Sequence, residues 1–185
     1  MLDTTLTIEQ IETLLVGFNK SPFNMRRNLA IPNCSWGFLN HEADLLVMSK
    51  ARHLTEVEIK RSWHDFVADF DKKHSHFDEK LSHFYYCVPA SIASKVFDWL
   101  YVGELKQTSH GFIPSIVGVT KNNKLCCGLI IYKDPDKYNK YGNISIAVIS
   151  GTIGKYKCTQ DDEIKLLRLL GMRVWGLKKK IASLQ

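Results

Sequence analysis

Three residues on two neighbouring segments, two acids and a lysine, have the types and spacing for chemistry at a divalent cation. Asp44 lies in the apolar run from Glu42 to Ser49, and Glu58 and Lys60 alternate with apolar residues in the segment from Leu54 to Lys60. These patterns predict two β-strands, and antiparallel pairing would place the three side chains on one surface. A carboxylate in a strand covered on both faces must be paired, hydrogen-bonded or metal-bound, because burying it bare costs several kcal/mol.

Such a set of residues suits phosphate chemistry. Mg²⁺ prefers oxygen ligands and usually keeps several waters, so Asp44, Glu58 and the main-chain carbonyl of Ile59 would suffice to bind it. The ion lowers the pKa of a bound water and neutralises charge on a phosphate, while the ammonium of Lys60 orients the water. Taken alone, however, the Glu-x-Lys spacing is more typical of an exposed strand face of alternating charges.

Two helices are predicted around these strands. Thr7 and Gln10 have the spacing of a capping box ahead of an apolar stripe that begins at Ile8. Ser62 is expected to cap a second helix that buries a stripe of aromatic and apolar residues, namely Trp63, Phe66, Val67 and Phe70.

On the far side of the second helix we expect Asp65, Asp69 and Lys72. Asp69 and Lys73 have the spacing of an exposed i, i+4 ion pair. Alternatively, Lys72 and Lys73 bind phosphates at the helix end.

The rest of the chain predicts further strands and helices. We expect strands at 28–31, 84–88, 116–120 and 125–132, with the last two joined by a hairpin turn, and helices at 91–100 and 161–182. Residues 143–158 show no clear pattern. A polar loop at 134–142 interleaves lysines with tyrosines, which suits nucleic-acid contacts or a solvated loop. The apolar stripe of the last helix packs either on the domain or on a second copy, which would make a homodimer.

Histidines are concentrated in one part of the chain, with six of the seven lying between residues 41 and 83. This concentration raises the alternative of a zinc site, although the spacings fit no standard finger. His74 and His76 could chelate together or with Asp78, and the plainer interpretation is a loop rich in polar histidines. His41 or His74 could also transfer a proton to a leaving oxygen.

Composition sets the broad class of the protein. The chain has 185 residues, of which 45% are hydrophobic and 24% charged, as expected of one globular domain spanning 1–185 with its core at about 8–132. Five cysteines without a CxxC pair indicate neither a disulfide framework nor a cysteine zinc ribbon. No apolar run approaches about 18 residues and the N-terminus does not resemble a signal peptide, so we expect a cytoplasmic protein without a membrane partner.

Charge is distributed unevenly along the chain. The net charge is +6: residues 1–40 are neutral, residues 41–100 hold ten acids and eight bases, and residues 101–185 hold six acids and fourteen bases. A basic last third is suited to a polyanion such as DNA, although a solvated surface also accounts for it.

Together these segments resemble the PD-(D/E)xK nuclease superfamily. The residues that show this resemblance are Ile31 to Gly37, His41 to Leu46, Glu56 to Lys60, and then Asp65, Asp69, Lys73, His74 and His76. Within the superfamily they look like a small bacterial and prophage branch described as DNA-repair-like. The resemblance covers about residues 8–90, and Ala43 replaces the proline of the motif.

The resemblance implies an α/β protein with a restriction-endonuclease-like core: a helix first, a central mixed sheet flanked by helices, and a second helix. It implies a Mg²⁺- or Mn²⁺-dependent nuclease that hydrolyses DNA in repair, recombination or prophage DNA processing. Asp44 and Glu58 would be the metal ligands and Lys60 the catalytic lysine.

Other acids lie close to this motif in the sequence. Either Glu9 or Glu12 would supply the glutamate that many members carry on the first helix, and the sequence does not separate them. Glu42 and Glu56 are spare acids that could hold a metal-bound water or lie on the surface. The same residues would also persist in an inactive nuclease fold that binds DNA or a protein without cutting.

Overall fold

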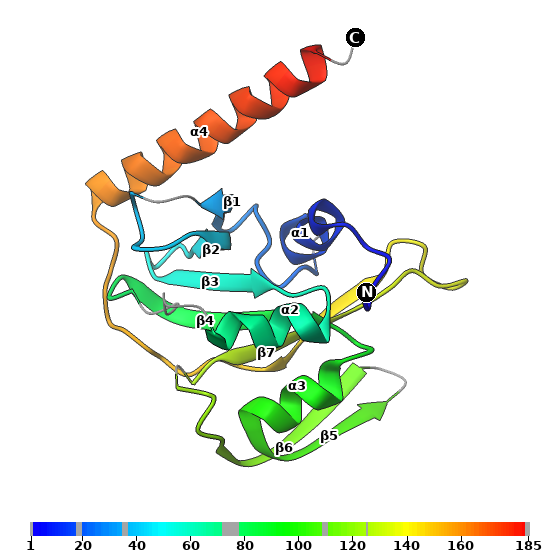
Figure 1. Ribbon diagram of the computed structural model, residues 1–185. Coiled ribbons are helices and arrows are strands. Elements are labelled where there is room, and N and C mark those ends of the chain that lie inside the picture. Colours follow the sequence, from blue (N-terminus) through cyan, green and yellow to red (C-terminus); the bar gives the residue numbers. More distant parts are fainter. Residues whose placement is uncertain are drawn as a thin grey trace.

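A six-stranded mixed sheet forms the centre of the protein (Figure 1). The structure is a computed structural model, and it describes residues 2–17, 20–34, 37–71, 78–108, 111–124 and 126–183. The strands, in spatial order, are β1 (Leu29–Cys34), β2 (Ala43–Met48), β3 (Leu54–Ile59), β4 (Leu81–Pro89), β7 (Gly128–Lys133) and β8 (Asn143–Val148). β2 is antiparallel to both its neighbours, β3, β4 and β7 run parallel, and β8 is antiparallel to β7. The expected α/β class with a central mixed sheet is therefore confirmed.

Helix α1 (Ile8–Val16) covers one face of this sheet. Thr7 and Gln10 form the expected capping box, which fixes where the helix starts. Ile11 and Leu15 are fully buried against strand residues such as Val57 and Ile59.

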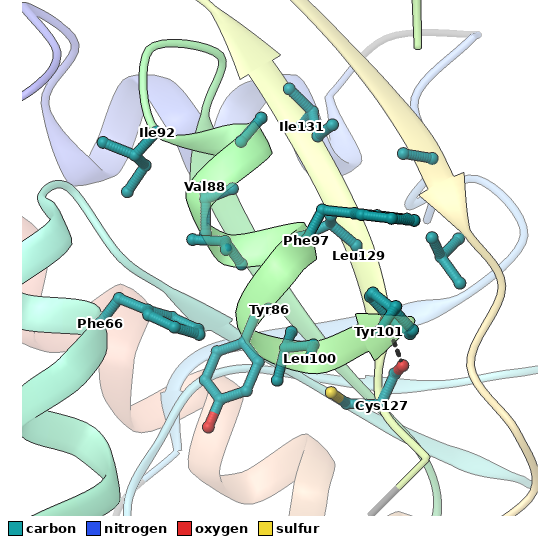
Figure 2. Packing of buried hydrophobic residues seen from close by; sticks show 14 of the residues in the cluster. Phe66, Tyr86, Val88, Ile92, Phe97, Leu100, Tyr101, Cys127, Leu129 and Ile131 are labelled. Carbon is teal, nitrogen blue, oxygen red and sulfur yellow. Dashed lines mark hydrogen bonds between the residues drawn. The ribbon is translucent and has the colours of Figure 1, made fainter. Parts of the chain in front are cut away.

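The opposite face is covered by helices α2 (Trp63–Ala68) and α3 (Ala93–Leu100). Ser62 caps α2 by accepting a hydrogen bond from the backbone N–H of Asp65. Figure 2 shows Phe66 of α2 beside Tyr86 and Phe97 of α3 beside Tyr101, whose hydroxyl donates a hydrogen bond to the carbonyl of Cys127 at 2.6 Å. Because alternate residues of β4 point to the two faces, each face has its own apolar cluster.

The C-terminal helix α4 (Gln160–Ala182) is anchored at its start. A capping box of Thr159 and Asp162 begins the helix, and Leu166 is buried with residues of β1 to β4. Beyond Gly171 every described residue of α4 is exposed, and the helix runs past the edge of the sheet (Figure 1). The predicted apolar stripe is therefore not the face that packs: of its members Leu170 contacts the core, together with Leu166 and Leu169, whereas Ile164, Leu167, Val174, Leu177 and Ile181 are exposed. In the described part of the chain, no helix combines the length and apolar character that crossing a membrane requires.

The predicted hairpin of 116–120 with 125–132 is wrong. Strand β6 (Gly111–Val119) pairs with β5 (Tyr101–Thr108) in a separate two-stranded sheet, whereas β7 lies parallel to β4. Leu129, Ile130 and Ile131 are apolar on both faces of their strand, so β7 must lie where both faces are covered. β6 does not need both of its faces covered, and it is largely exposed.

Two further differences concern the sheet edges. β1 runs through Pro32 to Cys34 instead of ending before it, because an edge strand can place the missing N–H of a proline on its open side. The core extends beyond residue 132, since β8 adds an antiparallel strand from the segment that showed no clear pattern.

Candidate functional site

The β2–β3 hairpin brings the predicted motif to one end of two adjacent strands. Leu45 pairs with Val57 and Leu46 with Glu56, so Asp44 at the start of β2 lies near the end of β3. The Asp44 carboxylate Oδ2 accepts a hydrogen bond from the backbone N–H of Ile59 at 2.8 Å. The expectation that this half-buried carboxylate needs a partner is thereby confirmed.

Lys60 lies inside the protein with two carboxylates. Its Nζ is 3.1 Å from Glu58 Oε2 and 2.8 Å from Asp69 Oδ1, and the hydroxyl of Tyr86 donates to Asp69 Oδ2 at 3.1 Å. Burial by itself would lower the pKa of Lys60, but the charges of Glu58 and Asp69 outweigh it and hold that pKa above its ordinary value. We call these four residues the Lys60 network.

Access to the Lys60 network is restricted. Lys60 is 3% and Glu58 4% exposed, and Asp69 is 5% exposed. A catalytic lysine must touch its substrate or the attacking water. In this arrangement the ammonium of Lys60 contacts Glu58 and Asp69 and is almost fully shielded from solvent. Lys60 could therefore act directly on an attacking water only if the side chains that now enclose its ammonium moved away.

The prediction that Asp69 forms an exposed ion pair with Lys73 is wrong for Asp69, which is buried. The α-helix ends at Ala68 and the chain continues as a 3₁₀ turn, Asp69–Asp71, which directs Asp69 inward to Lys60. Its partner in that prediction, together with Lys72 and His74, lies outside the described residues. The sequence carries one signal that could have identified Asp69 as a partner of Lys60. An ammonium has three donors, so a lysine buried beside one glutamate needs a further acceptor nearby.

Glu56 and His41 form a second buried pair. The Nε2 of His41 is 2.7 Å from Glu56 Oε2, and its Nδ1 is 2.6 Å from Asn40 Oδ1. Glu56 is fully buried, so it is neither a surface acid nor a lining residue of an open site. Among the residues that the structure describes, no three His, Cys, Asp or Glu side chains are grouped to hold a metal ion; His74 and His76, considered for zinc, are not among those residues.

An open cleft of about 620 Å³ lies between α1 and α4, and we call it the α1–α4 cleft. One wall is acidic, and the opposite wall on α4 is basic and apolar. Its charged lining residues are Glu9, Glu12, Glu42 and Asp44 on the first wall and Arg173 and Lys180 on the second. Asp44 is therefore the one member of the predicted triad among the described residues that line this cleft.

The two helix glutamates, which the sequence does not separate, have different surroundings. Burial, with the charges of Glu9 and Asp44 added to it, raises the pKa of Glu12 to about 7. Its Oε1 is shielded from solvent and has no hydrogen-bond partner. In contrast, hydrogen bonds to its own backbone N–H and to Thr7 lower the pKa of Glu9. Glu12 is therefore the helix acid whose surroundings disfavour its charged form.

Asp44 and Glu12 fit a hard divalent cation in their chemistry. Mg²⁺ is commonly bound by one or two carboxylates, waters and substrate phosphates, so two carboxylates on one wall are enough. A cation between them would satisfy the unpartnered oxygen of Glu12 and offset its repulsion from Asp44. Glu58, the second ligand expected from the sequence, is instead engaged by Lys60.

Comparison with known proteins gives no functional assignment. No family model matches the chain, and no curated protein matches it. The structure is similar to that of SPO1766, a protein of unknown function from Silicibacter pomeroyi, with 10% sequence identity, a TM-score of 0.48, and coverage of 85% of this chain and 82% of that one.

Proposed function

We propose that the protein is a Mg²⁺- or Mn²⁺-dependent nuclease that hydrolyses phosphodiester bonds of DNA in the α1–α4 cleft. The observation that supports this most directly is the unpartnered carboxyl oxygen of Glu12, an acid whose pKa is raised in part by the charge of Asp44 and which lines the same cleft as Asp44, Arg173 and Lys180. One wall suits a cation and the other suits phosphates. DNA repair, recombination or prophage DNA processing is the setting that the resemblance implies.

The order of elements supports the same proposal at a coarser level. Helix α1 precedes the β1–β2–β3 meander, and α2 connects β3 to the parallel strand β4. This is the order of a first helix, a mixed sheet and a second helix that the resemblance implies. A restriction-endonuclease-like core is accordingly part of the proposal.

Each wall of the cleft has a distinct role in this mechanism. Asp44 and Glu12 would hold the ion, which when bound lowers the pKa of a water and neutralises charge on the phosphate. Arg173 and Lys180 attract the DNA backbone and orient the phosphate toward the acidic wall.

The Lys60 network acts through Asp44. By fixing the end of β3 it holds the N–H of Ile59, which in turn orients the Asp44 carboxylate. Lys60 and Glu58 are thus positioning residues in this proposal, whereas Asp44 is a catalytic residue.

The test measures cleavage of supercoiled plasmid, single-stranded and branched DNA with Mg²⁺, with Mn²⁺ and with EDTA. We expect metal-dependent cleavage that falls by at least about tenfold in Asp44→Asn, whose amide oxygen can still accept from the Ile59 N–H. The matched control is Asp98→Asn on the exposed side of α3, which should cleave as the wild type does. Cleavage that is equal in Asp44→Asn and wild type would overturn the assignment.

One observation favours a second function. Because Glu58 and Lys60 are buried and paired with each other, the motif resembles one that stabilises the fold of a DNA- or protein-binding module without catalysing hydrolysis. That module would bind DNA in a salt-sensitive manner, cleave none of the substrates with either metal, and release no heat on titration with Mn²⁺. The same set of measurements therefore decides between the two functions.

A further inference from the structure

Three exposed aromatic side chains each have a lysine ammonium over the ring. The Nζ atoms of Lys137, Lys140 and Lys178 lie 4.7, 5.0 and 4.9 Å from the ring centroids of Tyr138, Tyr141 and Trp175, respectively. These rings are 85%, 60% and 64% exposed. Single exposed aromatic residues are common on proteins, but here each of the three rings is combined with a lysine, so that each site offers both a flat aromatic face and a positive charge. We call the three pairs the aromatic–lysine sites.

These sites lie on both sides of α1. The 134–142 loop, which holds two of them, is tied to the start of the chain by a hydrogen bond from Thr4 to Asp134, and Gly142 lies close to Leu14 of α1. On the other side, Trp175 precedes Gly176, which lines the α1–α4 cleft. Figure 1 shows α4 passing over β1 and the loop after β7 projecting beyond α1. Trp175 therefore lies next to the cleft, in a hollow of α4 that shares Met172 and Gly176 with it, and Tyr141 lies on the loop beside Leu14 of α1; none of the three rings is among the described residues that line the cleft itself.

Charge on α4 suits a polyanion. From Ile164 to Ala182 the helix holds six basic residues and no acid. Two copies of this helix packed against each other would bring like charges together, which disfavours the second copy as the partner of its exposed stripe. A phosphate backbone meets no such repulsion and releases counterions when it binds.

We propose that the nucleic acid bound here is single-stranded, with unpaired bases stacked on Trp175, Tyr138 and Tyr141 and with phosphates at the neighbouring lysines. In a duplex the base faces are already stacked and cannot meet a protein ring, whereas every unpaired base offers one. The inference rests on the proposed function in that it names the substrate class of the same cleft.

The test measures the binding of labelled oligonucleotides by fluorescence anisotropy in EDTA, where no metal-dependent cleavage occurs. The ligands are oligothymidine of about 20 nucleotides, a duplex of equal length, and an RNA strand of equal length. We expect the single strand to bind at least about tenfold more tightly than the duplex, and the RNA arm shows whether the sugar is also recognised.

Aromatic variants test the contacts themselves. Trp175→Ala and the double variant Tyr138→Ala/Tyr141→Ala should each weaken single-strand binding by about tenfold, whereas Trp175→Phe and Tyr138→Phe/Tyr141→Phe should retain most of it. The control is Lys121→Ala on the turn after β6, which should bind normally. Since all three rings are exposed, the melting temperatures should be unchanged.

Failure of this inference is distinguishable from failure of the proposed function. Equal or tighter binding of the duplex, or alanine variants that bind like wild type, would overturn the single-strand inference even if plasmid is cleaved. Tight, ring-dependent single-strand binding without cleavage in any metal would support the inference and overturn the nuclease.

Discussion

Lys60 keeps its charge inside the protein because two carboxylates outweigh the cost of burial. A buried lysine alone would lose its proton or destabilise the fold, but Glu58 and Asp69 both lie within hydrogen-bond distance of its Nζ. The hydroxyl of Tyr86 satisfies a further oxygen of Asp69. Lys60 is therefore the cation that both carboxylates share, and its removal takes away the charge that compensates two buried acids.

Lys60→Ala should lower the free energy of unfolding by about 3–5 kcal/mol, because Glu58 and Asp69 would lose their shared cation. Urea denaturation followed by circular dichroism measures this change. Lys95→Ala, at an exposed position on α3, is the matched control and should change stability by less than about 0.5 kcal/mol. An equally small effect at Lys60 would mean that the network does not form.

Glu12 should make stability depend on pH. Its folded pKa of about 7 lies above the ordinary value of 4.5, so the folded protein binds more protons between these values and its stability falls as pH rises from about 4.5 to about 7. Glu12→Gln should therefore melt at a higher temperature than wild type at pH 8 and at a similar temperature near pH 4.5.

Metal provides the second part of this test. Mn²⁺ at pH 8 should raise the melting temperature of wild type and have little effect on Glu12→Gln, because the ion would bind the charged carboxylate. The same substitution at exposed Glu104 on β5 controls for loss of a negative charge. A wild-type protein that is indifferent to Mn²⁺ while Glu12→Gln is stabilised would support a raised pKa without a metal site.

At the scale of elements, α4 has two unlike halves. Its first half starts at the Thr159 capping box and buries Leu166, whereas the second half exposes Val174, Leu177 and Ile181 together with its bases. The first half thus stabilises the fold, and the second half forms the basic wall of the α1–α4 cleft.

A chain that ends at Gly171 should fold and lose nucleic-acid affinity. The melting temperature should fall by no more than a few degrees, while affinity for oligothymidine at low salt should fall by about an order of magnitude. A full-length variant with Lys178, Lys179 and Lys180 changed to Ala separates charge from helix length. Extensive unfolding of the shortened chain would show that the second half stabilises the domain after all.

Elements defined by local signals were predictable from the sequence. The caps at Thr7 and Ser62 and the alternation in 54–60 depend on residues close together in the chain, and the structure confirms them. The partner of β7 depends on a distant strand, β4, so the local turn at 121–124 was misleading. Asp69 was misplaced for a similar reason, since a 3₁₀ turn changes which way a residue points and the sequence gives no marker for it.

At the scale of the whole molecule, the structure explains the uneven charge. Several acids of residues 41–100 lie inside, where Glu56 meets His41 and Glu58 and Asp69 meet Lys60. The basic residues of the last third are not buried, and six of the fourteen lie on α4. The uneven distribution of charge was visible in the sequence. Which of the acids are buried was not, because their burial depends on how α2 packs across the sheet.

The Lys60 network also constrains the order of folding. Hairpin β2–β3 is local and can close early, but Tyr86 reaches Asp69 only after β4 has docked parallel to β3 across the α2 crossover. The hydrogen bond from Tyr86 is therefore the last part of the network that can form. We expect the Lys60 network to be complete, and closed to water, only in a chain whose β4 has paired with β3.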